Sequence, residues 1–133
     1  MAIDEMLSAR RSFVAETVLA NRTYRRICLE ARSRGMMVRL VYVGVPTVED
    51  AIARVALRVA KGGHDVPEVD LRRRWPRTHE NLGWFAQHAD SVDVFANTWD
   101  AQPTLIAYAR KGRVTLLDTD TLPAVTHVLR PLV

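Results

Sequence analysis

The sequence has a single cysteine, only two lysines and no apolar run of the length that crosses a membrane. One cysteine, Cys28, excludes a disulfide bond within the chain and favours a reducing compartment. A membrane-spanning helix requires about 18 consecutive apolar residues, and the chain does not open with a basic and then apolar leader. A soluble protein of the cytoplasm is therefore expected.

The phosphate-binding loop of P-loop kinases, G-x-x-x-x-G-K-[ST], is also missing from the 133 residues. Such a loop holds the phosphates of ATP, and among the six glycines only Gly62 and Gly63 are adjacent. His64 follows this pair but has no second ligand at the spacing of a metal site. We therefore predict neither a cofactor nor a metal bound by motifs of this chain alone.

Arginine is the residue that the sequence has in excess. All of the 19 basic residues except Lys61 and Lys111 are arginines, and the net charge is +4. Guanidinium groups are planar and permanently charged, and they match the oxygens of a phosphate in pairs. The charge therefore favours a phosphorylated ligand, although it also suits nucleic acid. No helix-turn-helix, zinc finger or RNA-recognition motif supports the nucleic-acid alternative.

Hydrophobic periodicity predicts helices that alternate with strands in one globular domain, residues 1–133. Helices are predicted at residues 3–9, 21–34, 47–61, 65–88 and 122–129. Strands are predicted at residues 12–17, 37–45 and 91–97, followed by a hairpin of residues 104–109 and 113–117. This order predicts an α/β fold with an open, mainly parallel sheet.

Two of the predicted helices carry basic residues on either side of the adjacent glycines, and we call residues 54–77 the lid segment. Thr47 with Asp50, and Asp65 with Glu68, have the spacing of a capping box at the start of each helix. On the second helix the stripe predicted to face the core consists of Leu71, Trp75, Thr78, Leu82 and Phe85. The opposite side carries Arg73, Arg74 and Arg77. Mobile arginines are typical of a phosphate-binding lid, and the alternative is a solvated basic surface.

These residues resemble a known family. The chain is similar to the carboxy-terminal two-thirds of the zeta-toxin-like P-loop kinases in the segments SFVAETVLA, ARSRG, RVALRVAKGGHDVP, LRRRWPRTHENL and FANTWD. The resemblance covers residues 12–107 and implies a partial P-loop kinase-like αβα sandwich. It places the family's first strand, phosphate loop and catalytic aspartate before Met1, so that the chain is a truncated or degenerate member.

The resemblance also implies an activity. The family reaction is ATP-dependent phosphorylation of a hydroxyl on a nucleotide-sugar or related small molecule, with ATP and Mg²⁺ as cofactors of the full-length family. An antitoxin or a second copy of the chain is an implied protein partner. Because the phosphate loop and the catalytic aspartate are missing, we expect no phosphate transfer by this chain alone. The alternatives are a non-catalytic module that binds a phosphorylated ligand or a protein, and a basic nucleic-acid binder.

Individual residues carry over from the family by position. Arg58 and Arg74 are the candidate catalytic residues, because such arginines neutralise the phosphoryl group during transfer. The candidate substrate-binding residues are Glu16, Thr17, Arg54, Arg73, Arg77 and Asn97. Val18 and Ala96 depart from the family, which often has a threonine and an aspartate at these positions.

The missing strand leads to a structural prediction. In the family's sheet, the strand before the phosphate loop lies between the strands that match residues 12–17 and 37–45. Unpaired backbone groups beside such a gap are costly to bury. We therefore predict that these two strands pair directly in parallel, joined by the helix of residues 21–34, or that a second chain fills the gap in an obligate oligomer.

Overall fold

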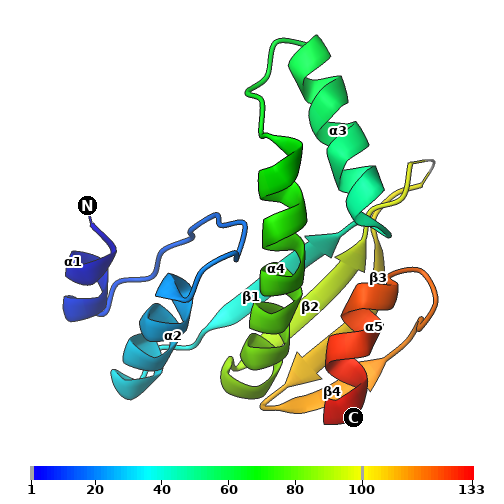
Figure 1. Ribbon diagram of the computed structural model, residues 1–133. Helices are drawn as coiled ribbons and strands as arrows, with labels where there is room; N and C mark the ends of the chain where they lie inside the picture. Colours follow the sequence, from blue (N-terminus) through cyan, green and yellow to red (C-terminus); the bar gives the residue numbers. More distant parts are fainter. Residues whose placement is uncertain (1, 100) are drawn as a thin grey trace.

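The computed structural model describes residues 2–99 and 101–133, and it contains a four-stranded sheet with helices packed on one face (Figure 1). The strands are β1 (Arg39–Gly44), β2 (Ser91–Ala96), β3 (Thr104–Arg110) and β4 (Arg113–Leu116), in the order β1-β2-β3-β4. Only β1 and β2 are parallel, and the other two pairs are antiparallel. The fold is α/β as predicted, but the sheet is mixed rather than mainly parallel, because only β1 and β2 are joined through helices.

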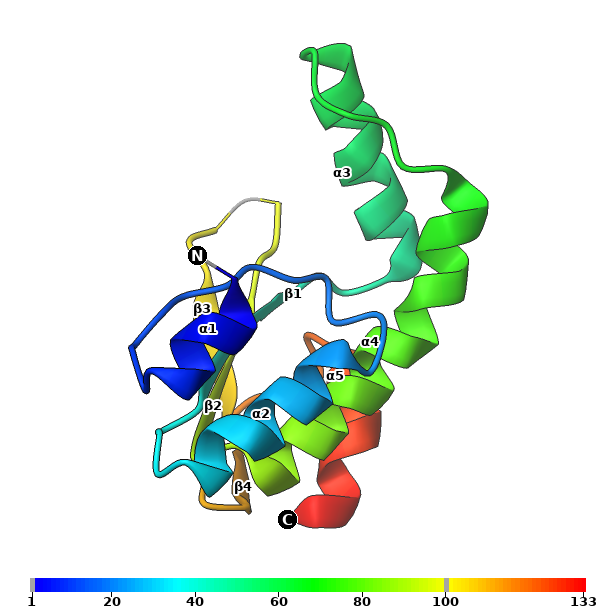
Figure 2. The ribbon, with the colours of Figure 1, turned by 90° about the vertical axis from the view of Figure 1, so that its left-hand side faces the viewer.

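The five predicted helices are all present in the described residues. They are α1 (Ile3–Ser8), α2 (Thr23–Ser33), α3 (Val48–Ala60), α4 (Glu68–His88) and α5 (Pro123–Leu129), and a 3₁₀ turn (Arg130–Leu132) follows them. Figure 2 shows α2, α4 and α5 on the same side of the sheet, with α1 beyond the β1 edge. None of the helices in residues 2–99 and 101–133 is long and apolar enough to cross a membrane.

The other face of the sheet has no helix across it in Figure 2. On this face Val41 and Val43 of β1 are 55% and 54% exposed. Val41 lies opposite Asp93 of β2, which lies opposite Tyr108 of β3. The described part of the chain therefore forms two layers, and the three-layer αβα sandwich is not seen in it.

The core lies between the sheet and α4, the longest helix. The most deeply buried large side chains of this core come from α2, α4, the sheet and the carboxy-terminal segment: Cys28, Leu82, Val92, Val94, Ile106, Leu122, Val125 and Leu129. Leu7 of α1 is equally buried, in a second, smaller cluster. Leu82 and Phe85 are buried as predicted, whereas Leu71, Trp75 and Thr78 are only half-buried. The reason is visible in Figure 1, where the first half of α4 extends beyond the sheet beside α3.

Turn and cap residues account for several element boundaries. The predicted hairpin is confirmed, and its two turn residues, Lys111 and Gly112, both have positive φ (50° and 80°), as a type I′ turn requires.

The first predicted capping box, Thr47 with Asp50, is confirmed in part. The Thr47 hydroxyl accepts the Asp50 N–H at 3.1 Å and donates to the Asp50 carboxylate at 2.8 Å.

The prediction of a second capping box, Asp65 with Glu68, is wrong. Helix α4 begins at Glu68 after Pro67, and no side chain caps it, so Asp65 has no capping role. The reason is Pro67, because a residue that precedes proline is disfavoured in the helical conformation. Val66 therefore lies outside the helix, which begins only after the proline.

The prediction of a strand at residues 12–17 is also wrong. Residues 11–20, which we call the N-terminal strap, have no regular structure and pair with no strand of the described chain. The direct parallel pairing with β1 is therefore absent, and the β1 edge away from β2 has no strand beside it among the described residues.

The strap is held by α4 instead of by β1. The Thr78 hydroxyl donates to the Val18 carbonyl at 2.9 Å, and the Asn81 amide donates to the carbonyls of Leu19 and Asn21 at 2.6 and 3.0 Å. Leu19 is buried with a φ of 58°, a left-handed conformation that breaks an extended strand. The helix thus binds three carbonyls at and just beyond the end of the strap.

Candidate functional site

The carboxyl ends of the parallel strands β1 and β2 meet at one edge of the sheet. Ligand sites of open α/β sheets lie outside the carboxyl ends of the strands. Here β1 leads into α3 through residues 45–47, and residues 97–99 follow β2. The two segments are joined by the Asn97 N–H, which donates to the Gly44 carbonyl at 2.8 Å.

Arg54 is the central side chain at this edge. It extends from α3, and its Nη2 donates to the Asn97 carbonyl at 2.9 Å. Its guanidinium carbon lies 4.5 Å from the centre of the Trp99 ring, close enough for a cation–π interaction. The Arg54 Nε is buried and has no hydrogen-bond partner among the described residues. The structure therefore brings together two predicted substrate-binding residues, Arg54 and Asn97, and leaves one arginine donor unsatisfied.

Asp50 and Trp99 complete this cluster, and neither was predicted to belong to the site. The Trp99 indole N–H donates to the Asp50 carboxylate at 2.9 Å. This hydrogen bond, followed by the one from the Thr47 hydroxyl, lowers the pKa of Asp50. The carboxylate is therefore ionised at neutral pH, and it fixes the indole over which the Arg54 guanidinium lies. We call Asp50, Arg54, Asn97 and Trp99 the sheet-edge cluster.

The lid segment projects beyond the sheet as two helices joined by residues 61–67 (Figure 1). The predicted glycine stop is confirmed, because Gly62 has a φ of 91° and the Gly63 N–H donates to the Arg58 carbonyl at 2.8 Å. Arg58 lies exposed on the last turn of α3. This turn chemistry lets the two lid helices change their relative angle without strain in a bulky residue.

Acidic neighbours neutralise some of the lid arginines. Arg73 forms an ion pair with Asp70 at 2.6 Å. Arg72 pairs with both Glu68 and Glu49, at 2.9 and 3.2 Å, and so joins α4 to the start of α3. Four arginines of the lid segment have no such ion pair within the described residues: Arg54, Arg58, Arg74 and Arg77. Arg58 and Arg74, on the two lid helices, are therefore among those whose charge is available to an anion, although the structure brings them into no mutual contact.

A buried histidine lies below the lid segment. His79 shares its Nδ1 with the Trp75 carbonyl at 2.7 Å and its Nε2 with the Tyr42 hydroxyl at 3.4 Å. Burial lowers the pKa of His79 and raises the pKa of Tyr42 to about 12. The imidazole is therefore neutral at pH 7, donates from Nδ1 and accepts from the tyrosine. It joins α4 to β1 and supports the sheet edge without carrying charge.

The remaining predicted residues lie elsewhere. Glu16 and Thr17 are exposed on the N-terminal strap, and the Thr17 hydroxyl accepts the Leu19 N–H at 2.9 Å, so it forms a local turn. Arg77 lies on the side of α4 that faces α2, where it borders a cavity together with Arg22 and Arg25. The structure thus distributes the predicted site residues over three places: the sheet edge, the lid segment and the surface between the strap, α2 and α4.

Metal-binding groups were not predicted, and in the described residues no three histidine, cysteine or acidic side chains form a cluster that could hold a metal ion.

The sheet-edge cluster can offer one positive and one negative side chain, an aromatic face and a carbonyl. Among these groups the Arg54 guanidinium is the one that can donate to an anion, through its unpartnered Nε, whereas the Asp50 carboxylate repels it. In searches of protein families, curated proteins and solved structures, nothing matches the chain.

Proposed function

We propose that the chain is the lid-bearing part of a zeta-toxin-like kinase domain, which binds a phosphorylated ligand between the lid segment and the sheet edge and transfers no phosphate by itself. The observation that carries the proposal is Arg54. This guanidinium is fixed over Trp99 and bound to the Asn97 carbonyl, yet its Nε is buried without a partner among the described residues.

An anion would complete the environment of Arg54. A buried donor without a partner is destabilising, and buried charges are normally paired. A phosphate oxygen supplies the missing acceptor, and the planar fork of arginine matches phosphate in geometry as well as in charge. Arg58 lies one helical turn from Arg54 on α3, so both side chains point to the same side of the helix.

The lid segment supports the same proposal. Arg58 and Arg74 lie on its two helices, with the glycine pair between them. In phosphoryl transfer, arginines of this kind neutralise the charge on the equatorial oxygens, while a phosphate loop and Mg²⁺ hold the nucleotide. The chain has arginines at these positions but lacks the phosphate-loop motif. Another segment has to supply that loop for chemistry to occur.

Mg-ATP is therefore expected to bind only weakly to this chain. Calorimetric titration should show no micromolar association, and addition of a UDP-sugar should release no ADP. Micromolar binding of Mg-ATP, or ADP release that depends on the acceptor, would show that the described residues contain a complete catalytic site.

Sulfate, phosphate or a UDP-sugar should in contrast protect the lid turn, residues 61–67, from limited proteolysis. Ligand at ten times its dissociation constant reduces the unliganded fraction about tenfold, and cleavage of the turn should slow accordingly. The double variant Arg58→Gln/Arg74→Gln should lose this protection. Arg113→Gln is the matched control, because Arg113 lies exposed on the β3–β4 hairpin, far along the chain from the lid.

Two results would contradict the anion site. An unchanged digestion pattern with and without anion would make the lid arginines a solvated basic surface. Tight binding of DNA that falls steeply between two salt concentrations, with indifference to UDP-sugar, would favour the nucleic-acid alternative, since release of counterions dominates such binding.

A further inference from the structure

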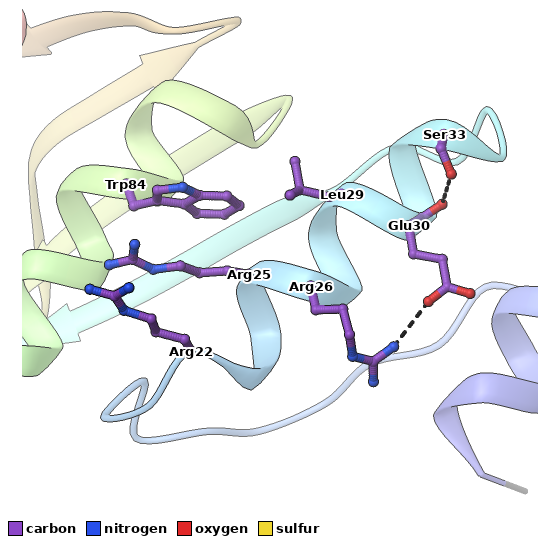
Figure 3. Close-up of a pocket in the computed structure, with 7 residues that line it drawn as sticks. All are labelled: Arg22, Arg25, Arg26, Leu29, Glu30, Ser33 and Trp84. Atoms are coloured by element: carbon purple, nitrogen blue, oxygen red, sulfur yellow. Dashed lines mark hydrogen bonds and ion pairs between the residues drawn. The ribbon is translucent and has the colours of Figure 1, made fainter.

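A second arginine-lined surface lies on the outer side of α2 and α4. Two adjacent cavities, of about 650 and 320 Å³, share Arg22 and Arg25. The smaller cavity is also lined by Arg77, Glu80 and Asn81 of α4 and by the end of the strap. Figure 3 shows the larger one, in which the side chains of Arg22 and Arg25 extend in the same direction from α2 toward α4. We call the two cavities together the α2–α4 groove.

Arg25 is held in one orientation within this groove. Its Nε donates to the Asn81 side-chain oxygen at 2.7 Å, and its guanidinium carbon lies 5.4 Å from the centre of the Trp84 ring. The side chain is only 17% exposed. Asn81 is itself fixed by the strap carbonyls, so the outer nitrogens of Arg25 are directed into the groove before any ligand arrives.

The positive charge in the smaller cavity exceeds the negative charge. Glu80 is the acidic residue that lines it, and its carboxylate lies 3.6 Å from Arg22 and 4.0 Å from Arg25. Charge-assisted hydrogen bonds are shorter, about 2.7 to 2.9 Å, so neither contact satisfies the arginine donors. Arg77 adds a third guanidinium, without an ion pair among the described residues. Three positive groups therefore face one solvated carboxylate.

The larger cavity adds an apolar wall. Trp84 stacks on His88 with ring centres 4.1 Å apart, which fixes the indole, and Leu29 lies at the end of the indole in Figure 3 with half of its surface exposed. Arg26 and Glu30, at the far end, pair with each other at 3.0 Å. The groove thus has a cationic end and an apolar middle, while its other end is internally neutralised.

We propose that the α2–α4 groove binds the phosphate monoester of a small aromatic or apolar compound. The phosphate contacts Arg22, Arg25 and Arg77, and the organic part lies against Leu29 and Trp84. Small-molecule sites combine apolar walls with a few fixed polar groups, and this groove has both, although it is open to solvent. The groove includes Arg77 of the lid segment, but it shares none of Arg54, Arg58 and Arg74, which carry the proposed site between the lid segment and the sheet edge.

The test is a two-dimensional NMR titration of the full chain with phenyl phosphate and with inorganic phosphate. The signals of the Trp84 indole N–H and the Arg25 Nε–H should shift with a dissociation constant of roughly 1 mM or below for phenyl phosphate. Inorganic phosphate should shift the Arg25 signal but bind more weakly, because it gains nothing from the apolar wall.

Variants distinguish binding in this groove from binding at the site between the lid segment and the sheet edge. Arg22→Gln and Arg77→Gln, at exposed positions, should each weaken phenyl phosphate about tenfold through loss of a charge-assisted hydrogen bond, whereas Arg113→Gln should have no effect. Unchanged affinity in both variants, or equal affinity for inorganic phosphate, would overturn the assignment. If phenyl phosphate no longer shifts the Trp84 signal in the double variant Arg58→Gln/Arg74→Gln but still shifts it in Arg22→Gln and Arg77→Gln, the ligand binds under the lid segment. That result would overturn this inference and leave the proposed function standing.

Discussion

Replacement of Asn81 by alanine should release the N-terminal strap and lower the free energy of unfolding by about 2 to 4 kcal/mol. Asn81 is 3% exposed and makes three hydrogen bonds, to the carbonyls of Leu19 and Asn21 and to the Nε of Arg25. Alanine leaves all three groups without their partner. A buried polar group that loses its partner is destabilising by its full desolvation penalty, which is larger than the net value of an ordinary hydrogen bond.

Urea unfolding and amide hydrogen exchange measure the two effects. Exchange in residues 17–21 should accelerate in Asn81→Ala more than exchange in the β2–β4 strands, because the strap opens without global unfolding. Gln87→Ala is the control, since Gln87 has a similar side chain on the same helix but is exposed, and its replacement should change stability by about 0.5 kcal/mol or less. Equal destabilisation by the two variants would mean that Asn81 does not hold the strap.

Asp93→Asn should lower the free energy of unfolding by about 1 to 3 kcal/mol at pH 7. Asp93 lies on the face of the sheet without helices, where its buried carboxylate accepts hydrogen bonds from Arg110 at 2.7 Å and from Arg39 at 3.3 Å. The Arg110 hydrogen bond is the main reason that the pKa of Asp93 is lowered, and Arg39 adds to it. Asparagine keeps the size of the side chain and removes its charge.

The destabilisation should depend on pH in a defined direction. The pKa of Asp93 is lower in the folded state than the usual 3.8, so the ionised group stabilises the fold above that value. This contribution is lost as the pH falls through the folded-state pKa. The difference between the wild type and Asp93→Asn should therefore be constant from pH 5 to pH 7 and shrink below about 3.8. Unfolding by urea at a series of pH values measures it.

Asp4→Asn is the matched control for Asp93→Asn. Asp4 is largely exposed and lies 3.5 Å from Arg26, an ion pair at the surface. Such pairs contribute about 0 to 1 kcal/mol, so this variant should differ little from the wild type at any pH. A difference between Asp93→Asn and the wild type that stays the same down to pH 2.5 would mean that packing, rather than charge, causes the destabilisation.

Local patterns predicted most of the elements because local physics determines them. The glycine pair ends α3, and Lys111 with Gly112 turns the chain between β3 and β4. The strand predicted at residues 12–17 is absent because a strand exists only beside a partner, and α4 instead binds the chain just after these residues, at the carbonyls of Val18 and Leu19. The pattern of residues 12–17 alone contains no information about that choice.

The candidate sites depend on contacts between residues that are far apart in the sequence. Arg54 was predicted as a ligand-binding residue, but its contact with Trp99 and the Asn97 carbonyl arises only because β2 ends beside α3. Arg77 was grouped with Arg73 and Arg74, and the helical twist places it beside Arg22 and Arg25 instead. The sequence thus predicts which residue types bind an anion, whereas the packing of α2, α3 and α4 determines which of them act together.

The long connection between the parallel strands also has a consequence for the order of folding. Strands β2, β3 and β4 follow one another through short connections, whereas pairing of Arg39 with Ser91 closes a loop that contains α3 and α4. Loop-closure entropy makes distant pairings slower to form than local ones. We expect β2–β4 to nucleate with α5 and with the last turns of α4, and β1 to join afterwards. The arginines of the lid are then positioned only in the final step, so that slow or incomplete docking of β1 impairs anion binding before it affects the rest of the fold.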